Sequence, residues 1–167
     1  WGHITAIGYE LYQEMLKEAV DRLKGIEVTP EVDPEIRIGL DAFIPEDYCP
    51  DQHLRLGLYK RLFSASADEL RAIGDELKDL YGPVPAPVRV LLAISEIRDI
   101  MKRLRLRRLE LFDEVLRLYV SRDSILELSR LRTVLAERTG RMSAEGLVEI
   151  PIRHGDVMNG VREILYA

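Results

Sequence analysis

The sequence of 167 residues contains one cysteine, no long hydrophobic run and no glycine-rich phosphate loop. A lone cysteine, Cys49, cannot build a disulfide framework, so we expect a reducing compartment and a cytoplasmic location. No apolar run approaches the roughly 18 residues that indicate a membrane span, and no signal peptide is recognisable. These absences exclude a disulfide-stapled secreted domain and argue against a membrane protein.

Recognisable catalytic and ligand-binding patterns are also missing. The three histidines, His3, His53 and His154, do not stand at metal spacing with cysteine or acidic residues, so we expect them at the surface or at helix caps. Cys49 has no recognisable base partner and is interpreted as a packed hydrophobe. No GxxxxGK[ST] or GxGxxG occurs. We therefore predict no catalytic residue, metal or cofactor, and a domain that is not an enzyme; an enzyme with a dispersed site is the hypothesis kept against this.

The composition is that of a globular domain with an ionic surface. Apolar residues make up 47% of the chain and charged residues 32%, which predicts a single domain over residues 1–167. Residues 1–84 carry 9 basic and 17 acidic side chains, whereas residues 85–167 carry 15 and 12. The acidic first half favours a basic partner surface. Ordinary solvated helix faces are the alternative explanation.

Hydrophobic spacing predicts helices over about 8–24, from 52 onward, after 66, from 85 or 87 to 104, from 124 to 138 and from 156 to 166. Ser66 and Glu69 form a capping box, followed by an apolar stripe of Leu70, Ile73, Leu77 and Leu80. Alternating residues predict strands at 35–41, 109–112, 116–120 and 147–152. The fold class is therefore α+β, with a small mixed or antiparallel sheet and several packed helices.

A basic run lies at the end of the long central helix and contains Lys102, Arg103, Arg105, Arg107 and Arg108. Five cations in seven residues would suit phosphate contacts. However, leucines are interleaved, no aromatic side chain is placed to stack on bases, and cations favour a helix C-terminus in any case. A nucleic-acid-binding accessory module that uses 102–108 is the alternative function.

Three stretches together resemble one family, the bacterial transcription-repair coupling factors. They are residues 2–16, with GYELY; residues 44–62, with the pattern IP..Y and then RL..YKRL; and residues 76–85, which end in YGPVP. The resemblance is to the C-terminal domain of that family and covers roughly residues 2–105. The chain begins with Trp1, and residues 1–8 match the junction from the motor domain, so we expect a piece of a larger translocase.

The resemblance implies a regulatory role. The full protein of that family is an ATP-driven DNA translocase that displaces stalled RNA polymerase and recruits the repair subunit UvrA. The terminal domain has no ATPase and folds back on the N-terminal UvrB-like module, where it covers the UvrA-binding surface. The expected partners are therefore that module directly, UvrA and RNA polymerase indirectly, and DNA through other domains. No membrane partner is expected.

The resemblance also points to particular residues. The acidic turn before Gly-x-x-Pro is implicated in docking, and here it contains Glu76 and Asp79. With Leu70, Ile73 and Leu77 facing inward, the helical period directs both carboxylates outward, about 60° apart around the helix. The next position, often basic in that family, is Leu80, so we expect an apolar contact in place of an ion pair. The remaining motif residues are expected to be structural or to make interdomain contacts: Pro45, Tyr48, Arg55, Tyr59, Lys60, Arg61, Gly82 and Pro85.

Overall fold

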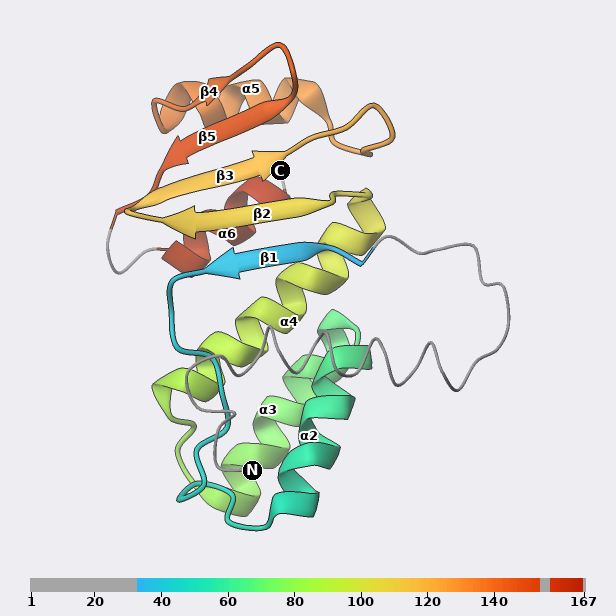
Figure 1. Cartoon of the computed structure of the whole chain (residues 1–167), viewed down its shortest axis with the longest axis vertical. Coiled ribbons are helices and arrows are strands. Elements are labelled where there is room, and N and C mark those ends of the chain that lie inside the picture. The colour runs from blue at the N-terminus through green and yellow to red at the C-terminus, as the bar shows by residue number, and fades with distance from the viewer. Residues whose placement is uncertain (1–32, 154–156, 167) are drawn as a thin grey trace. The chain divides into compact units, whose positions relative to one another are not determined.

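The computed structural model describes residues 33–153 and 157–166, and Figure 1 shows their arrangement. The predicted helix over 8–24 and two of the histidines, His3 and His154, lie outside these residues. The described part contains five helices and five strands in this order: β1 (Glu35–Ile38), α2 (Gln52–Ser64), α3 (Ala67–Tyr81), α4 (Ala86–Leu104), β2 (Arg108–Phe112), β3 (Val115–Tyr119), α5 (Leu128–Glu137), β4 (Arg141–Met142), β5 (Leu147–Pro151) and α6 (Val157–Leu165).

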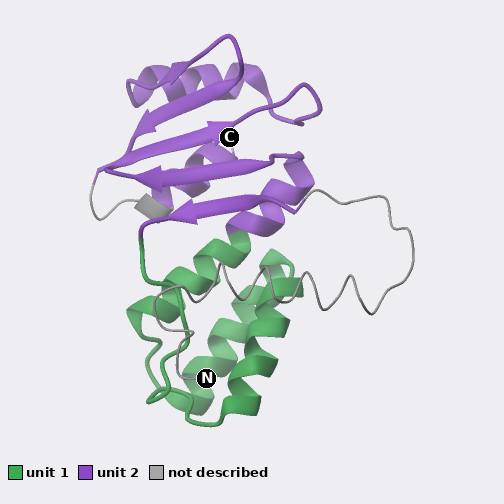
Figure 2. Ribbon diagram, in the orientation of Figure 1, with its two compact units in different colours: residues 1–29, 40–96 green, residues 30–39, 97–167 purple. Residues whose placement is uncertain are grey.

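The chain divides into two compact units (Figure 2). The first unit comprises residues 1–29 and 40–96, and the second comprises residues 30–39 and 97–167. The division falls within α4. The expectation of one domain over 1–167 stays a prediction.

The first unit is helical among its described residues, and its helices begin where the sequence places caps. The Asp51 carboxylate accepts hydrogen bonds from the backbone N–H groups of His53 and Leu54, and this starts α2. The predicted capping box is confirmed: Ser66 Oγ accepts from the Glu69 N–H at 3.4 Å, and Glu69 Oε2 accepts from the Ser66 N–H at 3.1 Å. Both helix starts are therefore set by local side-chain chemistry.

Helical spacing groups Leu54 with Leu58 and Leu62 on one face of α2, and Leu80 with the apolar stripe of α3, but Leu54 and Leu80 are solvent-exposed. Leu54 at the start of α2 is 55% exposed and Leu80 at the end of α3 is 65% exposed, whereas Leu58 and Leu77 are buried. Helical periodicity gives the angle of a side chain around the axis but not how far the neighbouring elements extend along it. Both exposed leucines lie in a terminal turn, which the packed neighbours do not cover.

The second unit is built on a five-stranded sheet with the strand order β1-β2-β3-β5-β4. β1 runs parallel to β2, and the other neighbours are antiparallel, so the predicted mixed sheet is confirmed. Alternate residues such as Leu109, Leu116 and Ile150 are fully buried. Figure 1 shows α6 behind the strands, and its Val161 and Ile164 are buried too. One face of the sheet therefore forms the core of this unit.

The opposite face of the sheet carries a row of alternating charges across all five strands. The strand register places these residues side by side in the order Arg37, Glu110, Arg117, Glu149, Arg141. Arg117 lies 3.2 Å from Glu149, which also receives Arg141 at 3.5 Å. Opposite charges on adjacent strands stabilise the pairing, so Arg117 and Arg141 both have a carboxylate partner within the sheet.

Three sequence predictions in the second unit are wrong in detail. The first strand ends at Ile38 instead of 41, because the chain bends at Gly39, and Leu40 is 42% exposed. The sequence suggests Ser124 as the cap of the helix expected from 124, with Glu127 three residues on, but the Ser124 hydroxyl donates to the Arg105 carbonyl and the helix begins at Leu128, with Glu127 at the N-cap position. Strand β4 was not predicted because two residues carry no periodicity.

Candidate docking surface at the end of helix α3

The C-terminal half of α3 separates buried apolar residues from exposed acidic ones. Ile73 and Leu77 are buried, whereas Glu76 is half-exposed and Asp79 and Leu80 are exposed. Sequence reasoning missed Asp75, which is also exposed. Its spacing of four residues from Asp79 is the signal that could have found it, because residues i and i+4 share a helix face. We call Asp75, Glu76, Asp79 and Leu80 the α3 patch.

Glu76 is not a free carboxylate. Arg61 on α2 donates from Nη1 to Glu76 Oε1 at 3.1 Å and from Nη2 to Oε2 at 2.6 Å, a bidentate ion pair between the two helices. This hydrogen bonding lowers the pKa of Glu76 and raises the pKa of Arg61. Sequence reasoning assigned Arg61 to fold or interdomain contacts without naming this partner.

Asp79 and Leu80 are exposed members of the α3 patch whose side chains have no polar partner among the described residues. Asp79 makes no hydrogen bond or ion pair with the described residues. It lies one turn from Asp75, and like charges at this spacing disfavour a helix slightly. Among the described residues, Asp79 therefore remains an exposed carboxylate without a polar partner.

The loop over residues 44–50, which precedes α2, is hydrogen-bonded to the C-terminal end of α3 and so fixes the position of the patch. The Tyr48 hydroxyl lies 3.1 Å from the carbonyl oxygens of both Leu77 and Gly82, to which it donates its hydrogen. The Tyr48 ring packs against Tyr81 with centroids 5.6 Å apart, and burial raises the pKa of Tyr48. The Tyr48 hydroxyl thus joins the loop to the last turn of α3 and to Gly82, which follows it.

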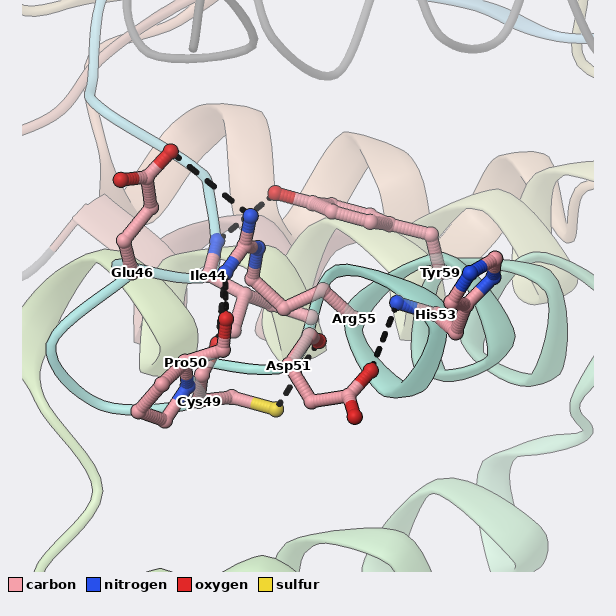
Figure 3. A network of polar contacts seen from close by, with 8 residues as sticks. All are labelled: Ile44, Glu46, Cys49, Pro50, Asp51, His53, Arg55 and Tyr59. Carbon is pink, nitrogen blue, oxygen red and sulfur yellow. Dashed lines mark hydrogen bonds and ion pairs between the residues drawn. The ribbon is translucent and has the colours of Figure 1, made fainter. Parts of the chain in front are cut away.

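The loop is in turn held by α2, as Figure 3 shows. The Tyr59 hydroxyl accepts a hydrogen bond from the Ile44 N–H at 2.8 Å, and burial raises the pKa of Tyr59. Arg55 donates to the carbonyl oxygens of Cys49 and Pro50 at 2.8 and 3.0 Å, and its Nη2 lies 3.6 Å from Glu46. Two side chains of one helix therefore fix both ends of the loop.

A family model described as the TRCF domain matches residues 38–133, more than half of the chain. The chain belongs to the TRCF domain family.

Named relatives agree with this assignment. The chain is 35% identical over 127 residues to the transcription-repair-coupling factor of Myxococcus xanthus, 37% over 115 residues to that of Escherichia coli K12, and 31% over 149 residues to that of Bacillus subtilis 168. These matches cover 75%, 65% and 87% of the chain but only 11%, 10% and 13% of the relatives. The chain therefore spans only about a tenth of the length of the relatives it matches.

A solved structure supports the fold. The crystal structure of the C-terminal domain of a transcription-repair coupling factor superposes with a TM-score of 0.69 and covers 80% of this chain and 89% of that one. Its sequence identity is 17%, so the likeness concerns the α+β fold alone.

Most motif residues of the TRCF domain are brought together around the loop and the end of α3. The Pro45 carbonyl accepts hydrogen bonds from the N–H groups of Tyr48 and Cys49 and so closes the turn. Gly82 follows α3 with a φ of 87°, a conformation that favours glycine. The Pro85 carbonyl accepts from the N–H groups of Val88 and Arg89 at the start of α4. Lys60 is exposed on α2 and makes no polar side-chain contact with described residues.

Cys49 and His53 lie where the sequence predicts them, in the core and at the surface respectively. Cys49 is fully buried, and His53 is exposed in the first turn of α2. Among the described residues, no group of three or more histidine, cysteine or acidic side chains is placed to hold a metal ion. No helix in the described ranges is long and apolar enough to cross a membrane.

The basic run 102–108 is largely neutralised by neighbouring carboxylates. Lys102 lies 3.6 Å from Asp33, Arg103 lies 3.1 Å from Asp99, and Arg107 lies 3.4 Å from Asp123. Arg108 pairs with Glu110 and stands over the Tyr119 ring. Arg105 alone among the five has no carboxylate partner in the described part of the chain. This arrangement does not favour the alternative function in nucleic-acid binding, because paired cations gain less from phosphates.

Replacing Tyr59 with phenylalanine tests the support of the loop. The change removes the acceptor of the buried Ile44 N–H, and an unsatisfied buried donor costs about 1–3 kcal/mol. We expect a loss of this size in urea denaturation, against almost none for Tyr119→Phe, whose hydroxyl has no partner in the described residues. Equal stability of the two variants would show that the Tyr59 hydrogen bond does not hold the loop.

Proposed function

We propose that this TRCF domain is a non-catalytic, autoinhibitory docking domain of a transcription-repair-coupling factor. It folds back on the N-terminal UvrB-like module of the same protein and masks the surface that UvrA binds. The observation that carries the proposal is the α3 patch, an exposed acidic helix end that the hydrogen bonds of Tyr48 to Leu77 and Gly82 hold in place. Binding of UvrA and RNA polymerase, ATP hydrolysis and DNA translocation belong to the parent protein.

The chemistry of the patch suits a basic partner. Asp75 and Asp79 offer carboxylates that have no ion-pair partner among the described residues, and a guanidinium group on the partner fits a carboxylate in a bidentate manner. Leu80, 65% exposed beside them, offers a small apolar contact. Charge complementarity of this kind fixes the orientation of docking and suppresses wrong partners.

The same chemistry suits a contact that must open. Exposed ion pairs gain little net free energy because water and salt screen them. A competitor that binds the open form therefore needs only a modest differential affinity to shift the population. A large apolar interface would resist such a shift.

Charge reversal of the patch in the full-length parent protein is the decisive experiment. Glu76→Lys together with Asp79→Lys places two cations against a basic surface, so the closed form is disfavoured. We expect UvrA to bind this variant about ten-fold or more tightly than the wild type, measured by titration of purified UvrA.

The control for this experiment is Glu137→Lys, which reverses an exposed carboxylate at the end of α5, in the other unit. It should leave UvrA affinity unchanged, whereas Asp79→Lys alone should raise it. Circular dichroism would establish that all variants are folded. An unchanged UvrA affinity in the double variant would refute the proposed docking role of the α3 patch.

A further inference from the structure

The two carboxylates assigned to docking are not equivalent in the structure. Asp79 makes no polar contact with the described residues, whereas both oxygens of Glu76 are bound by Arg61 from the neighbouring helix. Arg61 and Glu76 belong to different helices of the same unit, so the pair is part of the fold of that unit. The acidic patch therefore carries its own counter-ion.

We propose that Arg61 is an internal competitor for the docking partner, which sets the strength of the closed form by occupying Glu76. This inference rests on the proposed function, because it assigns a regulator to the same surface. A partner of matching chemistry is a surface with a guanidinium or ammonium group. That group must displace Arg61 from Glu76 or share the carboxylate with it.

The geometry of the pair explains the competition. Arg61 presents Nη1 and Nη2 to Oε1 and Oε2 at 3.1 and 2.6 Å, which is the fork-to-fork arrangement that an incoming arginine would also use. While this pair is formed, a partner arginine reaches only the remaining lone pairs of Glu76. The Arg61 charge also repels an approaching basic surface. Asp79, without such a neighbour, is available to the partner first.

Exposure makes the internal pair displaceable. The side chains of Arg61 and Glu76 remain 48% and 41% exposed, so water screens their attraction. Beyond Glu76, no other polar side-chain partner holds the Arg61 guanidinium among the described residues. Exchange of one guanidinium for another is therefore nearly balanced, which leaves the closed form weak enough to open.

The test is Arg61→Met in the full-length parent, because methionine keeps the apolar stem and helix propensity but removes the charge. Freeing Glu76 should strengthen the closed form, so UvrA should bind about two- to five-fold more weakly, as expected for one exposed ion pair. Titrations are best made in an Asp79→Asn background, where partial opening brings UvrA binding into a measurable range.

Arg132→Met is the matched control. It removes one exposed positive charge from α5, in the other unit, where Arg132 makes no polar side-chain contact with the described residues. This variant should leave UvrA affinity within experimental error. In a Glu76→Gln background, Arg61→Met should lose most of its effect, because no carboxylate remains to be freed.

The outcomes separate the two proposals. If the charge reversal at Glu76 and Asp79 raises UvrA affinity but Arg61→Met leaves it unchanged, the counter-ion role is wrong and the docking role stands. Tighter UvrA binding by Arg61→Met would also overturn the inference, since it would mean that Arg61 itself holds the partner. If the charge reversal has no effect, the proposed function fails and the counter-ion role fails with it.

Discussion

Replacing Gly146 with alanine is expected to destabilise the second unit by about 3 kcal/mol. Gly146 closes the turn between β4 and β5, where its N–H donates to the Ser143 carbonyl and its carbonyl accepts from the Val120 N–H. Its φ of 89° lies in the left-handed region, and a Cβ added there would stand 2.2 Å from the Val120 carbonyl oxygen. Backbone strain and a backbone clash therefore act together, and urea denaturation followed by circular dichroism measures the loss.

Gly57→Ala is the control for this prediction, with the opposite sign. Gly57 lies inside α2, and a Cβ there would meet no heavy atom within 4 Å. Alanine in a helix interior is favoured over glycine by roughly 0.5–1 kcal/mol, so this variant should gain stability. If Gly146→Ala proved as stable as Gly57→Ala, the conformation assigned to the β4–β5 turn would be wrong.

Features that depend on neighbouring residues in the chain were predictable from the sequence. The capping box of Ser66 and Glu69 is complete within four residues, and the turn at Asp113 and Glu114 joins two alternating runs. Both positions of that turn have a positive φ, of 50° and 60°, which suits a tight hairpin. The α+β class follows from such local signals.

Features that depend on distant parts of the chain were not predictable. The parallel pairing of β1 with β2 joins residues more than 70 positions apart, and no local pattern specifies it. Ser124 has the sequence of a helix cap, but its hydroxyl is engaged by the Arg105 carbonyl 19 residues earlier. In both cases a tertiary contact, which one segment cannot encode, decides the outcome.

The candidate docking surface likewise has some features that the sequence predicts and others that it does not. The helical period alone places Glu76 and Asp79 on the outer side of α3. The pairing of Glu76 with Arg61 spans 15 residues and two helices, and the Tyr48 hydroxyl reaches a carbonyl 34 residues away. The direction of the acidic side chains is therefore a local property, whereas their availability to a partner depends on the packed structure.

Charge at the level of the whole chain also needs the structure for its interpretation. The acidic excess of residues 1–84 includes the open carboxylates of Asp75 and Asp79. Many cations of residues 85–167 nevertheless have carboxylate partners: Arg117 pairs with Glu149 on the adjacent strand, and Arg108 pairs with Glu110 on its own strand. Net charge alone would suggest two interaction surfaces, and the pairing leaves the acidic one as the stronger candidate.

Replacing Leu77 with alanine is expected to cost about 2–5 kcal/mol, because the side chain is 1% exposed in the core of the first unit and its loss leaves a cavity. Leu80→Ala, three residues further along α3, should change stability by no more than about 0.5 kcal/mol, since Leu80 is already 65% exposed. Urea denaturation of the two variants measures this difference directly.

For docking, in contrast to stability, Leu80 is expected to be the residue that matters. Leu80→Ala keeps the fold but removes the apolar member of the α3 patch, so in the full-length parent it should raise UvrA affinity while the melting temperature stays unchanged. If Leu80→Ala leaves UvrA affinity unchanged as well, Leu80 has no role in the closed form and the α3 patch is purely ionic. A Leu77→Ala variant as stable as wild type would contradict the packing of α3 itself, on which the outward direction of Glu76 and Asp79 depends.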